Sequence, residues 1–116
     1  MADPTYVDLT VNGNHTVAAG TALAAAQTLA DAEPELTVLA VANSDDDTGL
    51  TFTVKAGDYP PAMAAGQGDL AVTVAFGKTV FIGPLESGRF LQSDGSLSFT
   101  SSPTTGTVIA YRVKRA

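Results

Sequence analysis

The sequence predicts an all-β fold, an antiparallel β-sandwich or a jelly-roll-like barrel, and three observations support this class. Apolar and polar residues alternate with a period of two in several short segments, as in strands that bury one face. Clusters of Gly, Pro, Asn, Asp and Ser separate these segments at short intervals. Hydrophobic residues make up 45% of the chain and charged residues 16%, so the chain can form a core.

The expected strands follow one another along the chain. Segment 36–43 is almost continuously apolar, which indicates a central strand. The acidic turn 44–49 separates it from segment 50–55, and we expect these two strands to pair as an antiparallel hairpin. The segments with strand character, in chain order, are 6–11, 36–43, 50–55, 70–75, 78–82, 89–92, 97–100 and 107–113.

Two segments interrupt this pattern. Residues 56–68 contain Pro60-Pro61, and adjacent prolines cannot donate ladder hydrogen bonds, so we expect a long loop there. Residues 21–31 are rich in Ala, with Thr21 at a candidate N-cap position and Pro34 beyond the end. This second pattern predicts one short helix over one end of the sandwich.

The length of 116 residues fits a single domain, 1–116, with an N-terminal arm over 1–5 and a basic C-terminal tail over 113–116. The net charge of −6 disfavours nucleic acid as a partner. Residues 1–54 contain eight acids and no Lys or Arg, whereas three of the six basic residues lie within 112–115. This asymmetry is either a solvated acidic face with a frayed tail, or a dipole that orients the molecule against itself or a partner.

The chain has no Cys, which excludes disulfides, thiolate nucleophiles and zinc–thiolate sites. This absence fits an intracellular origin or a fold stabilised by assembly. The N-terminus lacks the basic and apolar regions of a signal peptide, and no apolar run approaches the roughly 18 residues of a membrane helix. We therefore expect a soluble protein made in the cytoplasm, with no membrane partner.

Residues that could carry chemistry are few. His15, the single histidine, adjoins the turn Asn12-Gly13-Asn14, where a solvated role is expected. Segment 66–71 matches a loose dinucleotide pattern, but a Pro-Pro loop precedes it and a strand follows, so it predicts a glycine turn. Asp45-Asp46-Asp47 lacks the alternation and closing acid of a calcium loop. We expect a non-enzymatic protein with no catalytic residue, cofactor or metal.

The second half of the chain carries several short blocks in order: KAGDYPPA at 55–62, GQGDLAVTV at 66–74, IGPLESGRFLQSDGS at 82–96 and AYR at 110–112. This series resembles small proteins encoded near the major capsid gene of tailed phages, which are treated as head decoration or minor capsid proteins. The resemblance covers roughly two thirds of the chain, and the first 35 residues match it less clearly.

The resemblance implies a structural virion protein on the exterior of the capsid. Such a protein binds the outer surface of the mature phage head and stabilises it as a cement protein. Its partners are then the major capsid protein and itself, as a homotrimer at three-fold positions.

The partner-binding residues expected on this basis belong to two groups. Tyr59, Pro60, Pro61 and Met63 would form an apolar loop tip, unless the loop packs on its own domain. Arg112, Lys114 and Arg115 belong to the basic end of the chain.

Three alternative functions stay open. One is a head–tail joining or tail accessory protein, and another is a carbohydrate- or cell-surface-binding module, which the lack of Trp disfavours. A glycoside hydrolase stays open because only spatial separation could reveal its paired carboxylates, but it is the most remote alternative, because the chain has no Trp and most Phe are expected to face inward.

Overall fold

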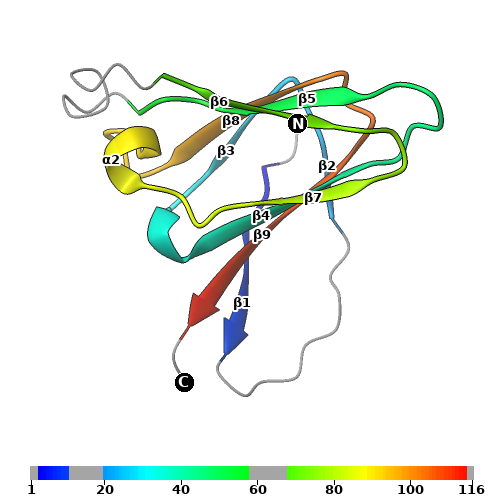
Figure 1. Ribbon diagram of the computed structural model, residues 1–116. Helices are drawn as coiled ribbons and strands as arrows, with labels where there is room; N and C mark the ends of the chain where they lie inside the picture. The colour runs from blue at the N-terminus through cyan, green and yellow to red at the C-terminus, as the bar shows by residue number, and fades with distance from the viewer. Residues whose placement is uncertain (1–2, 11–19, 58–67, 115–116) are drawn as a thin grey trace.

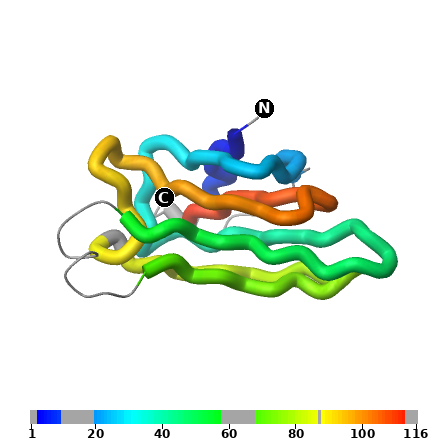
Figure 2. The backbone as a smooth tube through the Cα atoms, turned by 90° about the horizontal axis from the view of Figure 1, so that it is seen from above, coloured from blue at the N-terminus to red at the C-terminus, as the bar shows by residue number. Residues whose placement is uncertain are grey.

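The computed structural model describes residues 3–10, 20–57 and 68–114, and these residues form a sandwich of two β-sheets (Figure 1). The predicted all-β sandwich is therefore confirmed. Viewed from above, β6 lies at one margin of the molecule and the N-terminal segment lies at the opposite margin (Figure 2). Among the described residues, no helix is long and apolar enough to cross a membrane.

The first sheet, sheet A, has the order β1 (Tyr6–Thr10), β9 (Gly106–Lys114), β4 (Thr37–Asn43) and β7 (Thr79–Ile82). The long strand β9 has two neighbours along one edge. Its first residues pair antiparallel with β2 (Thr21–Ala22), and its last five pair in parallel with β1. The strand predicted to be central, β4, lies between β9 and β7, which confirms its position inside a sheet.

The second sheet, sheet B, has the order β3 (Ala26–Leu29), β8 (Leu97–Ser102), β5 (Leu50–Val54) and β6 (Leu70–Val74). All its pairs are antiparallel. Its strands alternate, with mostly Leu, Phe and Val facing the core, together with Gln27 and Ser101, and with small polar residues or Ala facing outward.

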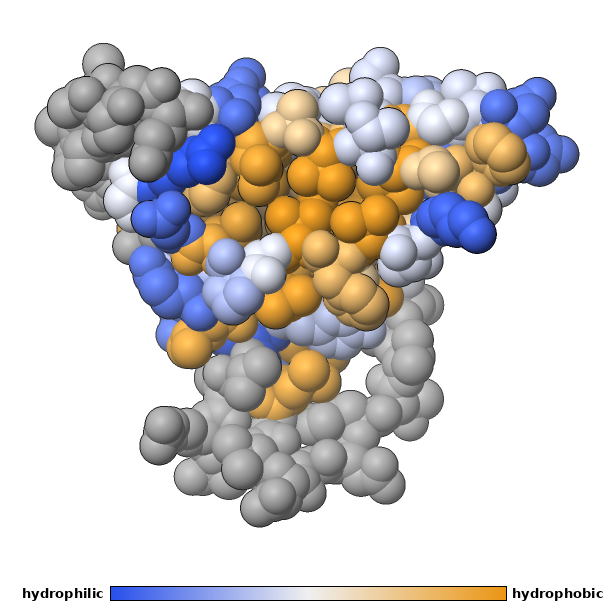
Figure 3. Space-filling view, in the orientation of Figure 1, coloured by the Kyte–Doolittle hydropathy of each residue, from blue (hydrophilic) through white to orange (hydrophobic). Residues whose placement is uncertain are grey.

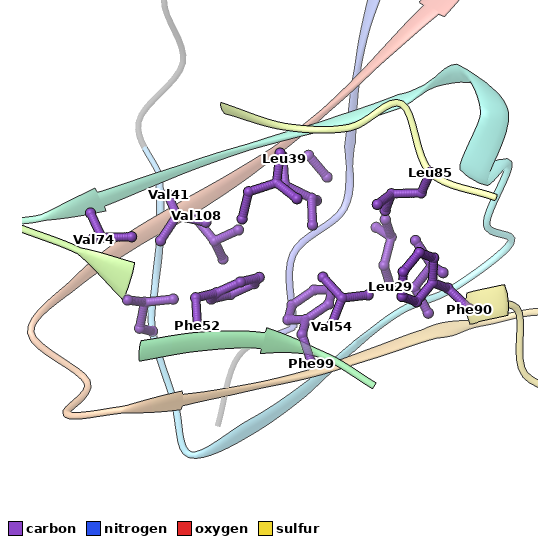
Figure 4. Close-up of a cluster of buried hydrophobic side chains, with 14 of the residues drawn as sticks. Leu29, Leu39, Val41, Phe52, Val54, Val74, Leu85, Phe90, Phe99 and Val108 are labelled. Atoms are coloured by element: carbon purple, nitrogen blue, oxygen red, sulfur yellow. The ribbon is translucent and has the colours of Figure 1, made fainter. Parts of the chain in front are cut away.

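One hydrophobic core fills the space between the sheets (Figure 4). The rings of Phe52 and Phe99, on neighbouring strands of sheet B, pack with their centroids 5.2 Å apart. Leu39 and Val41 of β4 and Val108 of β9 are fully buried on the inner face of sheet A. Because burial of such side chains contributes about 1.5–3 kcal/mol each, this layer supplies most of the folding energy.

The prediction of a helix over 21–31 is wrong. This segment forms β2 and β3, and β3 pairs antiparallel with β8. Residues 26–29 alternate exposed and buried, with Gln27 and Leu29 pointing inward. Alanine side chains are too small to give a strong apolar stripe, so the ladder with β8 and the burial of Leu29 outweigh helix propensity.

The prediction of a hairpin between 36–43 and 50–55 is also wrong, although both strands exist. β4 lies in sheet A and β5 in sheet B, so the turn between them carries the chain from one sheet to the other. The buried Asn43 side chain fastens this crossing, because its Nδ2 donates to the carbonyls of Thr48 at 2.9 Å and Val74 at 3.1 Å. Alternation shows which residues face inward but does not assign them to a sheet.

The chain beyond β7 folds differently from the extended segment expected at 89–92. Residues Ser87–Phe90 form a single helical turn, α2, and Phe90 is buried in the core. The tight turn expected at 93–96 is confirmed, with Gly95 at a φ of 85° that favours glycine. A short 3-10 helix, η1 (Pro34–Leu36), precedes β4.

Candidate interaction surface

The outward face of sheet A is the most unusual surface of the described molecule. Cross-strand register places Val7, Tyr111 and Val38 in one row, and Ile109, Ala40 and Phe81 in the next. Leu9 extends the apolar area along β1, and a row of Thr107, Ala42 and Thr79 borders its other end. None of the described outward side chains on these four strands is charged.

Several of these apolar side chains reach solvent. Phe81 is 68% exposed on the edge strand β7, and Leu36, just before β4, is 42% exposed. Val7, Val38, Ile109 and Tyr111 are half-buried by their neighbours on the sheet. We name the set Val7, Leu9, Val38, Ala40, Phe81, Ile109 and Tyr111 the apolar face.

The outward face of sheet B has the opposite character. Its rows, in register, are Ser102, Thr51 and Thr73, then Ala26, Thr100, Thr53 and Ala71, then Thr28 and Ser98. Hydroxyl groups dominate this surface, which we name the hydroxyl face. It is an ordinary solvated face of an antiparallel sheet.

The contrast between the two faces makes the apolar face the candidate contact surface of the described residues. Water solvates the hydroxyl face well, whereas a contiguous apolar surface without charge marks a protein or ligand interface. The signal was present in the sequence, because segments 36–43 and 107–113 are apolar at consecutive positions. Such runs indicate strands buried on both faces, and among the described residues only the inner face is covered.

The loop expected to bind a partner has its ends at one tip of the sandwich. Tyr59, Pro60, Pro61 and Met63 lie outside the described residues, as do His15 and Arg115. The described residues on either side of segment 58–67, Gly57 and Gly68, are held by polar contacts.

Asp69 and Arg89 make the polar contacts on either side of segment 58–67. Asp69 Oδ1 accepts the backbone N–H of Ala56 at 2.7 Å, and Asp69 Oδ2 accepts Lys55 Nζ at 2.9 Å. The Ala56 hydrogen bond, followed by the Lys55 hydrogen bond, lowers the pKa of Asp69. Arg89 donates from Nε to the Gly68 carbonyl at 3.2 Å, and its own carbonyl accepts Gly57 N–H at 2.7 Å. Residues from 55–57, 68–69 and 89 thus meet in a clamp, which joins the described residues on either side of segment 58–67.

Arg112 lies in an intramolecular cluster at the other end of β9. Its Nε donates to Asp8 Oδ1 at 2.6 Å, and its Nη2 donates to Asp8 Oδ2 at 3.1 Å. Together the two bonds form a bidentate pair. A further bond reaches Glu33 Oε1 at 2.7 Å, and the guanidinium stacks 4.2 Å from the centre of the Tyr6 ring. The hydrogen bonds that Arg112 donates to the Asp8 carboxylate raise the pKa of Arg112.

This placement gives Arg112 a structural role that the sequence did not suggest. The Tyr6 hydroxyl is 2.6 Å from Thr37 Oγ1 and accepts the Glu33 backbone N–H at 2.8 Å, so the cluster joins β1, β4, β9 and η1. Only 14% of the Arg112 side chain is exposed. Lys114, the last residue of β9, lies within the segment expected to be a free tail.

The three aspartates of the β4–β5 turn bring their carboxylate oxygens within 4.8 Å of one another. Asp45 Oδ1 accepts the backbone N–H groups of Asp46 at 2.7 Å and Asp47 at 3.1 Å. The Asp47 N–H is the main cause that lowers the pKa of Asp45. These hydrogen bonds stabilise the turn, which gives the aspartates a structural role.

Replacing Arg112 by Gln is expected to lower the free energy of unfolding by more than Glu33→Gln does, because Asp8 loses two charge-assisted hydrogen bonds. Urea denaturation followed by far-ultraviolet circular dichroism at pH 7 measures this. The matched control is Glu33→Gln, whose side chain is 50% exposed, and it should cost less than about 1 kcal/mol. Equal losses in the two variants would show that the Asp8 pair adds no stability.

The clamp predicts a pH dependence. Because folding lowers the pKa of Asp69, its contribution is fully present above the ordinary value of 3.8 and is lost as the pH falls through the folded-state pKa. The melting temperature of Asp69→Asn should lie below that of the wild type at pH 6, and the two should converge toward pH 2. Asp46→Asn controls for the removal of one negative charge, and a constant difference between wild type and Asp69→Asn would contradict the prediction.

Comparison with protein-family models, with curated protein sequences and with solved structures finds no match to this chain.

Proposed function

We propose that this protein is a non-enzymatic structural subunit that decorates the outside of a phage capsid, and that it binds through the apolar face. The observation that carries the proposal is the contrast between the uncharged apolar face of sheet A and the hydroxyl face of sheet B. The capsid as partner rests on the sequence blocks that resemble phage decoration proteins.

The geometry suits a subunit that lies flat on a larger protein surface. A sandwich presents its two faces in opposite directions, so a shell that covers the apolar face leaves the hydroxyl face in solvent (Figure 1). Neutral apolar contact also tolerates the net charge of −6, because no charge has to be desolvated at this face. Phe81, with 68% of its surface exposed, is the natural anchor, since aromatic residues dominate binding energy at interfaces.

The size of the apolar face favours multivalent binding. Four strands about 4.8 Å apart, each contributing about five residues of 3.3 Å, give an area of about 300 Å². A stable interface buries about 800 Å² on each partner. A single subunit would therefore bind weakly, and a closed homotrimer that engages three copies of the major capsid protein at once would gain by effective concentration. Lys114 and Arg115, at the basic end of the chain, would pair with acidic residues of the shell.

A carbohydrate-binding module is the second candidate, and one observation favours it. A hollow of about 330 Å³ on the hydroxyl face is lined by polar side chains that include Asp3, Thr28, Lys55, Ser98 and Thr100. Hydroxyl, carboxylate and ammonium groups can bind sugar hydroxyls, but Phe99, the aromatic residue at this hollow, is 1% exposed and offers no stacking platform. Binding on a glycan array that Ser98→Ala weakens would favour this candidate over decoration.

Light scattering after size exclusion should give the mass of a trimer, three times 11.8 kDa, for the purified protein. The reason is that an exposed apolar surface on a domain this small favours self-association. A ring of higher order would favour a head–tail joining protein instead. The mass of a monomer would contradict the expected trimer in solution. Trimers could then form only on the shell.

Binding to capsid shells tests the proposed surface. We expect Phe81→Asp and Ile109→Asp to reduce occupancy on expanded shells of the encoding phage at least tenfold, because each places a charge in an apolar contact. Quantitative gel analysis of sedimented shells measures the occupancy. The matched controls, Thr51→Asp and Thr73→Asp on the hydroxyl face, should bind like the wild type.

Circular dichroism should show that all four variants fold. Loss of binding in the hydroxyl-face variants with full binding of the apolar-face variants would overturn the proposal.

A further inference from the structure

The sandwich is closed along one margin. There, Asp3 contacts Thr28 of the edge strand β3. The Thr28 backbone N–H donates to Asp3 Oδ1 at 3.2 Å, and the Thr28 hydroxyl donates to Asp3 Oδ2 at 3.3 Å. Pro4 is buried beside this contact, and Tyr6 packs on the core. The N-terminal segment thus caps the edge of sheet B and covers the inner side chains behind it.

Along the opposite margin, no described segment covers the sheet edges. This margin is formed by β6, the edge of sheet B, and β7, the edge of sheet A (Figure 2). Leu70, Val72 and Val80 belong to the inner faces of the sheets and pack against the core, yet each is only half-buried. Apolar side chains are visible between the two edges in the space-filling view (Figure 3). Phe76, in the connection between the two strands, is 51% exposed.

Among the described residues, the edge of β6 has none of the features that normally protect an edge strand. Leu70–Val74 contains no charge, no Pro and no Gly, and among the described strands only β5 pairs with it. Edge strands of stable proteins are usually blocked by charges, prolines, bulges or a covering segment. By contrast, β3 at the other edge of the same sheet has its Asp3 cap. The asymmetry points to β6 as a pairing site.

The dimensions of the opening favour a single strand as its occupant. The two sheets of a sandwich lie about 10 Å apart, and a five-residue strand is about 17 Å long. The opening is therefore about 170 Å² in area, far below the roughly 800 Å² that each partner buries in a stable interface between globular surfaces. A single added strand needs less area, because main-chain hydrogen bonds supply part of its affinity.

We propose that the open margin binds an extended segment of a partner protein, about five to seven residues long, by β-strand addition to β6. The segment would have apolar side chains at alternate positions. These side chains would cover Val72 and Val80, and the intervening residues would face solvent beside Ala71 and Thr73. This site is separate from the apolar face, so the proposal does not depend on the capsid as partner.

The test uses the full-length protein labelled with nitrogen-15 and a panel of synthetic peptides with blocked ends. The peptides have the sequence Thr-Val-Thr-Val-Thr-Val-Thr, with Leu, Ile or Phe replacing Val in other members. Amide hydrogen exchange and chemical-shift titration measure the binding. We expect slower exchange in β6 and a dissociation constant at least tenfold weaker for a peptide that is N-methylated at alternate residues, because methylation removes the donors needed for pairing.

Two groups of variants separate this site from the apolar face. Val72→Thr and Val80→Thr keep the branched shape but replace a methyl group by a hydroxyl, so we expect weaker peptide binding and wild-type shell occupancy. Phe81→Asp should show the reverse. If the threonine variants do not fold, alanine at Leu70 replaces them as the variant of the same opening.

Three outcomes would overturn the proposal. One is the absence of binding by every peptide of the panel up to millimolar concentration. Another is equal binding of the N-methylated peptide, which would show hydrophobic adsorption without pairing. The third is protection of β6 in the free protein together with a dimeric mass, because a second copy would then be the occupant of the opening.

Discussion

The structure depends on the packing of two inner sheet faces against each other. Phe52 and Phe99 from sheet B meet Leu39, Val41 and Val108 from sheet A, and the chain has no Cys to add a covalent link. The chain crosses repeatedly between the two sheets, and the contact between their inner faces holds the layers together. The buried Asn43 amide, bonded to the carbonyls of Thr48 in the β4–β5 turn and Val74 at the end of β6, shows how a polar side chain can fix such a connection.

The same core also determines which surfaces are left for a partner. Strands β4 and β9 occupy the middle of sheet A and are apolar on both sides, so sheet A covers the core with one face and presents the apolar face with the other. Sheet B alternates apolar and hydroxyl residues and needs no cover. The N-terminal segment protects one margin and leaves the margin of β6 and β7 open. Both proposed binding surfaces are therefore sides of the sheets that no described residue covers.

Charged residues near the ends of the sandwich hold its elements together. Arg112 joins β1, β9 and η1 through Asp8 and Glu33, and Asp69 joins the residues on either side of segment 58–67. Basic and acidic residues that looked like partner contacts in the sequence are thus partly internal. Arg112 shows why composition alone misleads, since its binding groups face its own chain.

The sequence by itself determined the all-β class, the inward residues of most strands and the turn at Asp94-Gly95, because period-two alternation and turn residues act locally. Tertiary structure decided which strands share a sheet, since Leu39 and Phe52 face the same core from opposite layers. It also turned the Ala-rich segment into β3, where pairing with β8 outweighs local propensity. The apolar face depends on both sequence and tertiary structure. The apolar runs are visible in the sequence, but only the cross-strand register brings Val7, Ile109 and Phe81 onto one surface. Such register arises from contacts distant in sequence, which no local pattern encodes.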